Sequence, residues 1–113
     1  EKKHMKGVVR YVHQQIWNGK YAREKLRAIR EQIRQNYDYI AEKLRGVKDG
    51  LVKPDITDEA KEQLTKADEE ISKQVEGLKQ NLGEWDGKID AKEKEIKGLR
   101  SELDLLTQYI SKL

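Results

Sequence analysis

Histidine is the side chain most often used for metal binding and proton transfer, and this chain has only two, His4 and His13. A metal site needs three or four ligands that converge on one point. No acidic pair stands near either histidine at ligand spacing, and the chain has no cysteine. We therefore expect no metal site and no cofactor.

Carboxylates are numerous and could act as general acids or bases if a fold gathered two of them around a substrate. The densest groups are Asp68 to Glu70 and the pair Glu93 and Glu95. On a solvated helix face nothing shifts their pKa values or holds a substrate between them. No nucleophile stands next to a base, and no glycine-rich loop follows a strand. We expect no catalytic residues and no enzyme activity.

Basic residues form a stripe with aromatic residues nearby. The stripe consists of Lys20, Arg23, Arg27, Arg30 and Arg34, and the aromatic residues are Trp17, Tyr21, Tyr37 and Tyr39. Such a pattern could follow a phosphate backbone, so one hypothesis is a nucleic-acid-binding clamp. The competing interpretation is intramolecular pairing with acids elsewhere in the chain, and a net charge of only +3 favours it.

Residues 1–17 have the pattern of a basic amphipathic helix, a type that can lie on anionic membranes. Its polar face holds Lys2, Lys3, Lys6 and Arg10, and its apolar face holds Met5, Val8, Val12 and Ile16. The apolar face is mostly valine, and packing against another helix explains it as well. We expect no membrane contact.

The elements that must position these residues are helices, because apolar residues recur at steps of three and four after Pro54. This stripe consists of Val75, Leu78, Leu82, Trp85, Ile89, Ile96, Leu99, Leu103, Leu106, Ile110 and Leu113, and Lys92 alone interrupts it. A repeat of this kind buries one narrow face against another helix, as in a coiled coil.

Pro54 forbids a helix through it and disfavours the helical region at Lys53, while Gly50 could provide a left-handed stop. Thr57 can cap a second helix. Short connections generally join antiparallel helices. The sequence thus predicts one all-α domain, 1–113, an antiparallel coiled-coil helical hairpin. Its first leg spans about 5–49, its turn 50–56 and its second leg about 57–112.

Charge and phase both favour pairing of the two legs. Residues 1–53 hold 14 basic and 6 acidic side chains, whereas 54–113 hold 10 and 15. The apolar phase slips by four residues near 35 and again near 73. If the two helices unwind at the same height, these two slips face each other, and facing residues have numbers that add up to about 108. The candidate ion pairs are Arg23 with Glu84, Arg30 with Glu76, Arg45 with Glu62, and Lys48 with Glu59.

Two alternatives stay open within the legs. Asn18 and Gly19 interrupt the apolar phase, which favours a kink or a short separate helix at the amino end. Asn81 to Gly87 could form a second turn and divide the second leg. Against that division, Gly77, Gly83, Gly87 and Gly98 all fall on outward positions, and the apolar phase is preserved across them.

Each tryptophan stands two residues before a glycine, at Trp17 and Trp85. This is similar to the Trp-x-Gly turn of small helical-hairpin proteins exported by specialised secretion systems. In that family the motif lies in the central turn, whereas the turn here holds Pro54, so the resemblance implies no function for this chain.

The chain begins at Glu1 and not at Met, so we expect it to be a piece of a longer protein. It contains no signal peptide, no membrane-spanning stretch and no cysteine, which favours a cytoplasmic location.

The predicted function is structural: a coiled-coil arm or docking element that organises a larger assembly. Two helices that share one apolar seam leave much of that seam exposed to solvent. We therefore expect a homodimer that forms a four-helix bundle. An apolar overhang at the end of the second leg supplies the predicted contact points, with the tryptophans as anchors. These partner-binding residues are Trp17, Trp85, Leu106, Ile110 and Leu113.

Overall fold

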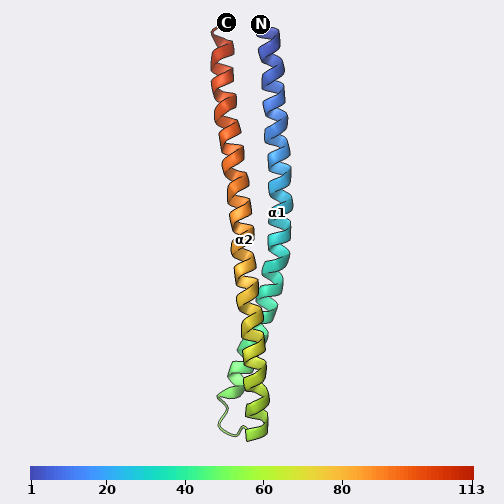
Figure 1. Cartoon of the computed structure of the whole chain (residues 1–113), viewed down its shortest axis with the longest axis vertical. Coiled ribbons are helices and arrows are strands. Elements are labelled where there is room, and N and C mark those ends of the chain that lie inside the picture. Colours follow the sequence, from blue (N-terminus) through green and yellow to red (C-terminus); the bar gives the residue numbers. More distant parts are fainter. The chain divides into compact units, whose positions relative to one another are not determined.

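The computed structural model describes all residues of the chain and consists of two helices, α1 (Lys2–Leu51) and α2 (Asp58–Ser111). The helices are antiparallel and pack against each other, so that both chain ends lie at the same end of the hairpin (Figure 1). The predicted all-α helical hairpin is confirmed. The helix bounds agree with the predicted legs to within a few residues.

The hairpin divides into two units. Unit 1 comprises Glu1–Ala28 and Asp86–Leu113, and unit 2 comprises Ile29–Trp85 with the connection between the helices.

In unit 2, α1 continues through Gly50 to Leu51, and no glycine in the chain has a positive φ. The prediction that Gly50 is a left-handed helix stop is therefore wrong. Pro54 ends the helix without such a residue, since it cannot continue a helix and restricts Lys53 before it. Gly50 instead allows a close approach, because a Cβ atom there would lie 3.1 Å from Cδ1 of Leu64 on α2.

The predicted helix start at Thr57 is confirmed. The Ala60 N–H donates to Oγ1 of Thr57 at 3.2 Å, which satisfies one of the free amide groups at the start of α2. Asp58 and Glu59 occupy the first turn, where the helix dipole favours acidic side chains.

The predicted pairing of facing residues is wrong by about one heptad. In unit 2, Gly50 faces Leu64 and Lys48 pairs with Asp68, so these residue numbers add up to 114 and 116. In unit 1, Gly19 faces Ile96, whose numbers add up to 115. A slip of seven residues leaves every apolar residue on the same face, so phase cannot distinguish the two registers.

The connection explains the shift. Residues 52–57 run alongside the first turns of α2 (Figure 1). The first turns of α2 therefore lie beyond the end of α1, and the residues of α2 that face α1 come later in the chain. The predicted ion pairs fail with the register. Arg23 instead contacts Glu24 at 3.6 Å, Arg45 contacts Glu42 at 3.3 Å, and Lys48 contacts Asp68.

The core of unit 1 consists of three buried side chains, Val12, Ile16 and Ile96. Gly19 is also buried, because α1 is one unbroken helix there and its bare Cα lies against Ile96. The separate amino-terminal helix, one of the two alternatives for this region, is wrong.

α2 likewise runs unbroken through residues 81–87, so the alternative of a second turn is wrong. Added Cβ atoms at Gly77, Gly83, Gly87 and Gly98 would meet nothing within 4 Å, which confirms their outward positions.

Candidate protein-interaction surfaces

The basic stripe predicted for nucleic acid is largely engaged by acids. Arg27 donates to Glu24 and to Glu93 of α2, both at 2.8 Å, within unit 1. Arg34 donates to Glu31 and Asp38 within unit 2. Arg23 is half-buried beside Glu24. Three of the five predicted side chains thus have carboxylate neighbours.

These ion pairs shift pKa values in the direction that keeps both partners charged. The hydrogen bond to Glu93 is the main cause that raises the pKa of Arg27, and that to Glu31 raises the pKa of Arg34. The pKa of Glu31 is lowered, chiefly because Arg34 donates to it. Lys20 and Arg30 are half-buried on α1.

Trp17 does not fill a gap between the helices. It is 62% exposed and points away from the core of unit 1, and its ring lies parallel to that of Tyr21, with centroids 5.9 Å apart. Tyr21 is 55% exposed, and the Lys25 ammonium lies 4.7 Å from its ring centroid. Trp17 and Tyr21 form a stacked aromatic pair on the outer face of α1.

The other predicted contact residues lie on α2 or, for Leu113, just after its end. Trp85 is half-buried in unit 2, as expected for a large side chain in the apolar seam. The predicted overhang is wrong for Leu106, which packs against the core of unit 1. Ile110 is half-buried and Leu113 is exposed. The end of α2 has a partner on α1's side of unit 1, since the Tyr109 hydroxyl donates to a Glu1 carboxylate oxygen at 3.4 Å.

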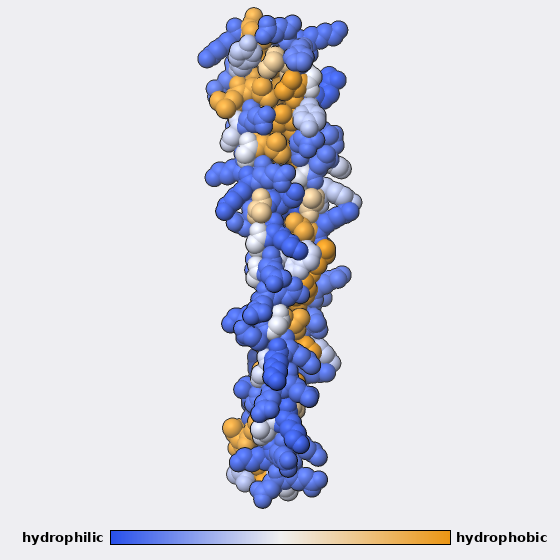
Figure 2. All heavy atoms as spheres, viewed as in Figure 1, coloured by the Kyte–Doolittle hydropathy of each residue, from blue (hydrophilic) through white to orange (hydrophobic).

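Unit 1 has a partly open apolar face, which we call the open seam. Figure 2 shows apolar side chains gathered along the line between the two helices near the chain ends. Val8, Leu99, Leu103 and Leu106 pack on the core but stay partly exposed. Tyr109 is 47% exposed and flanks this seam on α2, and the exposed Leu113 follows the end of the helix. Leu105 is 66% exposed on the outward side of α2, one heptad after Gly98.

The sequence analysis missed Leu105, although a signal was present. It stands next to the heptad residue Leu106, so a helix with one buried face cannot bury both.

The charge differs between the units. Unit 1 holds 14 basic and 8 acidic side chains, and unit 2 holds 10 and 13, so their net charges are +6 and −3. The excess positive charge of unit 1 lies on α1, because residues 2–23 contain six lysines and arginines and no acid.

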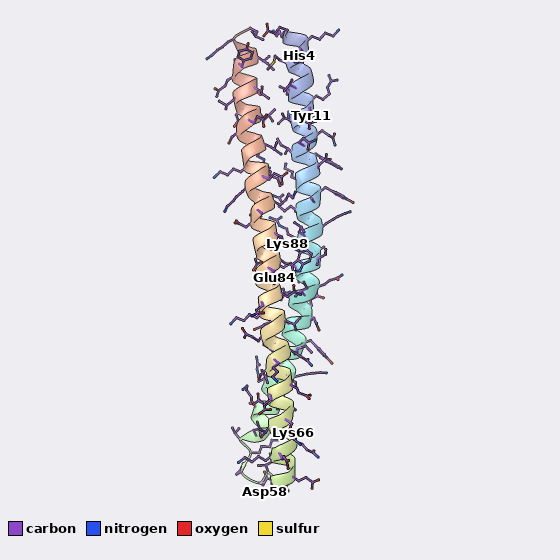
Figure 3. The ribbon with its side chains drawn as sticks, viewed as in Figure 1. His4, Tyr11, Asp58, Lys66, Glu84 and Lys88 are labelled. Atoms are coloured by element: carbon purple, nitrogen blue, oxygen red, sulfur yellow. The ribbon has the colours of Figure 1, made fainter.

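The histidines lie apart from any cluster of ligands. His4 is on the first turns of α1 (Figure 3), and no group of three or more histidine or acidic side chains is placed to hold a metal ion. No pocket is present in either unit. Neither helix is long and apolar enough at any point to cross a membrane.

Comparison with protein-family models, curated proteins and solved structures finds no match for this chain. The surfaces themselves are therefore the basis for a functional proposal.

Proposed function

We propose that this chain is a structural protein-interaction module, a coiled-coil hairpin that pairs with a second copy of itself and organises a larger assembly. The observation that supports this most is the size of the core. Only three apolar side chains, Val12, Ile16 and Ile96, are buried, although both helices have apolar residues at heptad spacing along their length. A surface with so much partly wet apolar area is suited to association.

A second hairpin is the simplest cover for the open seam of unit 1. Two helical hairpins that pack face to face form a four-helix bundle, in which the half-exposed positions of both copies become core. Leu106 and Ile110 lie in this seam, Tyr109 flanks it, and the exposed Leu113 follows the end of α2. These side chains are the proposed contacts, and the carboxylates and amines around them would form a polar rim.

Analytical ultracentrifugation over a wide range of chain concentration tests this function. The expected result is a reversible change from the mass of one chain to that of two as concentration rises. A single species of 13.3 kDa at every concentration would exclude the homodimer.

The alternative is a nucleic-acid clamp on Lys20, Arg23, Arg27, Arg30 and Arg34. The carboxylates beside Arg23, Arg27 and Arg34 make it the weaker candidate, since a phosphate would have to compete with them. A gel-shift titration with single- and double-stranded DNA over a range of salt separates the two functions. Binding that weakens steeply with salt and disappears when these residues become glutamine would favour the clamp.

A further inference from the structure

The stacked pair of Trp17 and Tyr21 is not explained by self-association through the open seam. Both rings lie on the face of α1 opposite the buried Val12, Ile16 and Gly19. Neither contributes to the core of unit 1, and exposed aromatic side chains of this size are typical of binding hot spots.

The pair lies in the middle of an exposed strip along the outer side of α1, which also contains Arg10, Gln14, Glu24 and Ala28. The two rings distinguish this strip from the other exposed sides of the helix, because both are large, more than half exposed and stacked on each other. Another helix laid along α1 would pack on the two rings as central knobs. We call this strip the outer face.

The charge around the outer face is positive and largely unneutralised. No acidic residue lies between Glu1 and Glu24, and no acid forms an ion pair with Lys3, Lys6 or Arg10. Glu24 itself lies beside Arg23 and Arg27. A partner that complements this face must bring acidic side chains and an apolar stripe.

Two features favour a helix over a nucleic acid on this face. One face of the Tyr21 ring already has the Lys25 ammonium 4.7 Å from its centroid, and the ring stacks on Trp17 as well, which leaves little room for bases. The surface also has no pocket, whereas single-strand binders combine stacking rings with a groove for the backbone.

We propose that the outer face of α1 binds an acidic amphipathic helix of another protein, with Trp17 and Tyr21 in its apolar stripe and Lys3, Lys6, Arg10 and Lys25 against its acids. This surface is separate from the open seam used for self-association, so the two proposals can fail independently.

The test uses the full chain with Trp85→Phe, so that Trp17 is the only tryptophan. The probe is a synthetic peptide of about four heptads with leucine at a and d, glutamate at e and g, and alanine elsewhere. Repulsion between its glutamates disfavours pairing of the peptide with itself. The expected result is saturable binding with a shift of Trp17 emission to shorter wavelength, and an affinity that falls with salt.

Matched variants locate the binding. Tyr21→Ala should lower the affinity for the peptide by about tenfold or more, as expected for a hot-spot ring. Tyr39→Ala, which removes an equally exposed tyrosine under Lys43 in unit 2, should leave the affinity within about twofold, as for an energetically neutral position. Tyr21→Phe keeps the stacked ring and should retain binding. Arg10→Glu should weaken binding, and Lys43→Glu should not.

Several results would overturn the proposal: no binding of the peptide, equal effects of Tyr21→Ala and Tyr39→Ala, or equal binding of a polyglutamate without leucine. Tighter Trp17-dependent binding of a single-stranded DNA of similar charge would assign the face to nucleic acid. Loss of the chain's own dimer on Trp17→Ala would assign it to a second copy. A monomeric chain that still binds the peptide would refute the homodimer alone.

Discussion

A single missing methyl group at Gly19 sets how closely the two helices of unit 1 approach. A Cβ atom there would lie 2.9 Å from Cγ1 of Ile96, and this carbon is near the backbone and cannot swing away cheaply. We predict that Gly19→Ala destabilises the chain. Overpacking against Ile96 should cost about 1–3 kcal/mol, and the higher helix propensity of alanine should offset about 1 kcal/mol of that cost.

The control for this prediction is Gly98→Ala, in the same unit, where a Cβ atom would meet nothing within 4 Å. It should stabilise the chain by about 0.5–1 kcal/mol. Urea unfolding followed by circular dichroism measures both, and equal effects of the two substitutions would contradict the role of Gly19.

The ion pair between Glu31 and Arg34 on α1 makes the stability of the chain depend on pH. Because Arg34 lowers the pKa of Glu31 below its ordinary value of 4.5, the folded chain favours the ionised carboxylate. This contribution to stability is present above pH 4.5 and is lost as the pH falls through the lowered pKa. We therefore predict that Glu31→Gln reduces stability at pH 6 and that the difference from the unmodified chain disappears on acidification.

Chemical denaturation at a series of pH values measures this difference. In an Arg34→Gln background the pH-dependent difference should be smaller, because only the weaker effects of Gln35 and Arg30 still lower the pKa of Glu31. A difference of the same size in that background would contradict the role of Arg34.

At the scale of the element, the start of α2 depends on one hydroxyl. Thr57→Ala removes the acceptor for the Ala60 N–H and should cost about 1 kcal/mol, whereas Thr57→Ser should cost little. Thr65→Ala is a stringent comparison, because the Thr65 hydroxyl donates to the Lys61 carbonyl inside the same helix. Alanine is the better helix former there, so this substitution should be neutral or stabilising in the same unfolding assay.

The elements show which features a sequence of this kind specifies. Pro54 and Thr57 locate the turn and the second helix start, since each acts on backbone groups within a few residues of itself. The pairing register is different, because every heptad slip preserves the apolar faces, and only the course of residues 52–57 decides among them. Gly19 and Gly50 belong to the same class: their role is an approach between helices, which depends on the register.

The same reasoning explains which site residues were predictable. The sequence located the exposed Leu113 and the half-buried Trp85, but it assigned Leu106 to an overhang because the register was one heptad off. Trp17 could not be placed from spacing, because Asn18 and Gly19 interrupt the apolar phase beside it although the helix continues through them.

At the scale of the whole molecule, stability and association should be linked. If a second copy covers the open seam, mass action stabilises the folded chain as concentration rises, so we predict a melting temperature that increases by a few degrees per tenfold in chain concentration. Tyr109→Gln should reduce this dependence and change the melting temperature at low concentration little, since Tyr109 is exposed in the single chain and its hydrogen bond to Glu1 is long, at 3.4 Å.

Leu103→Gln provides the contrast on the same helix. Leu103 packs against the core of unit 1, so this substitution should lower the melting temperature at every concentration. The two variants separate burial within one hairpin from burial between two. If Tyr109→Gln acted like Leu103→Gln, the seam would be complete in one chain. The three buried side chains would then be its whole core, and self-association would have no apolar surface to cover.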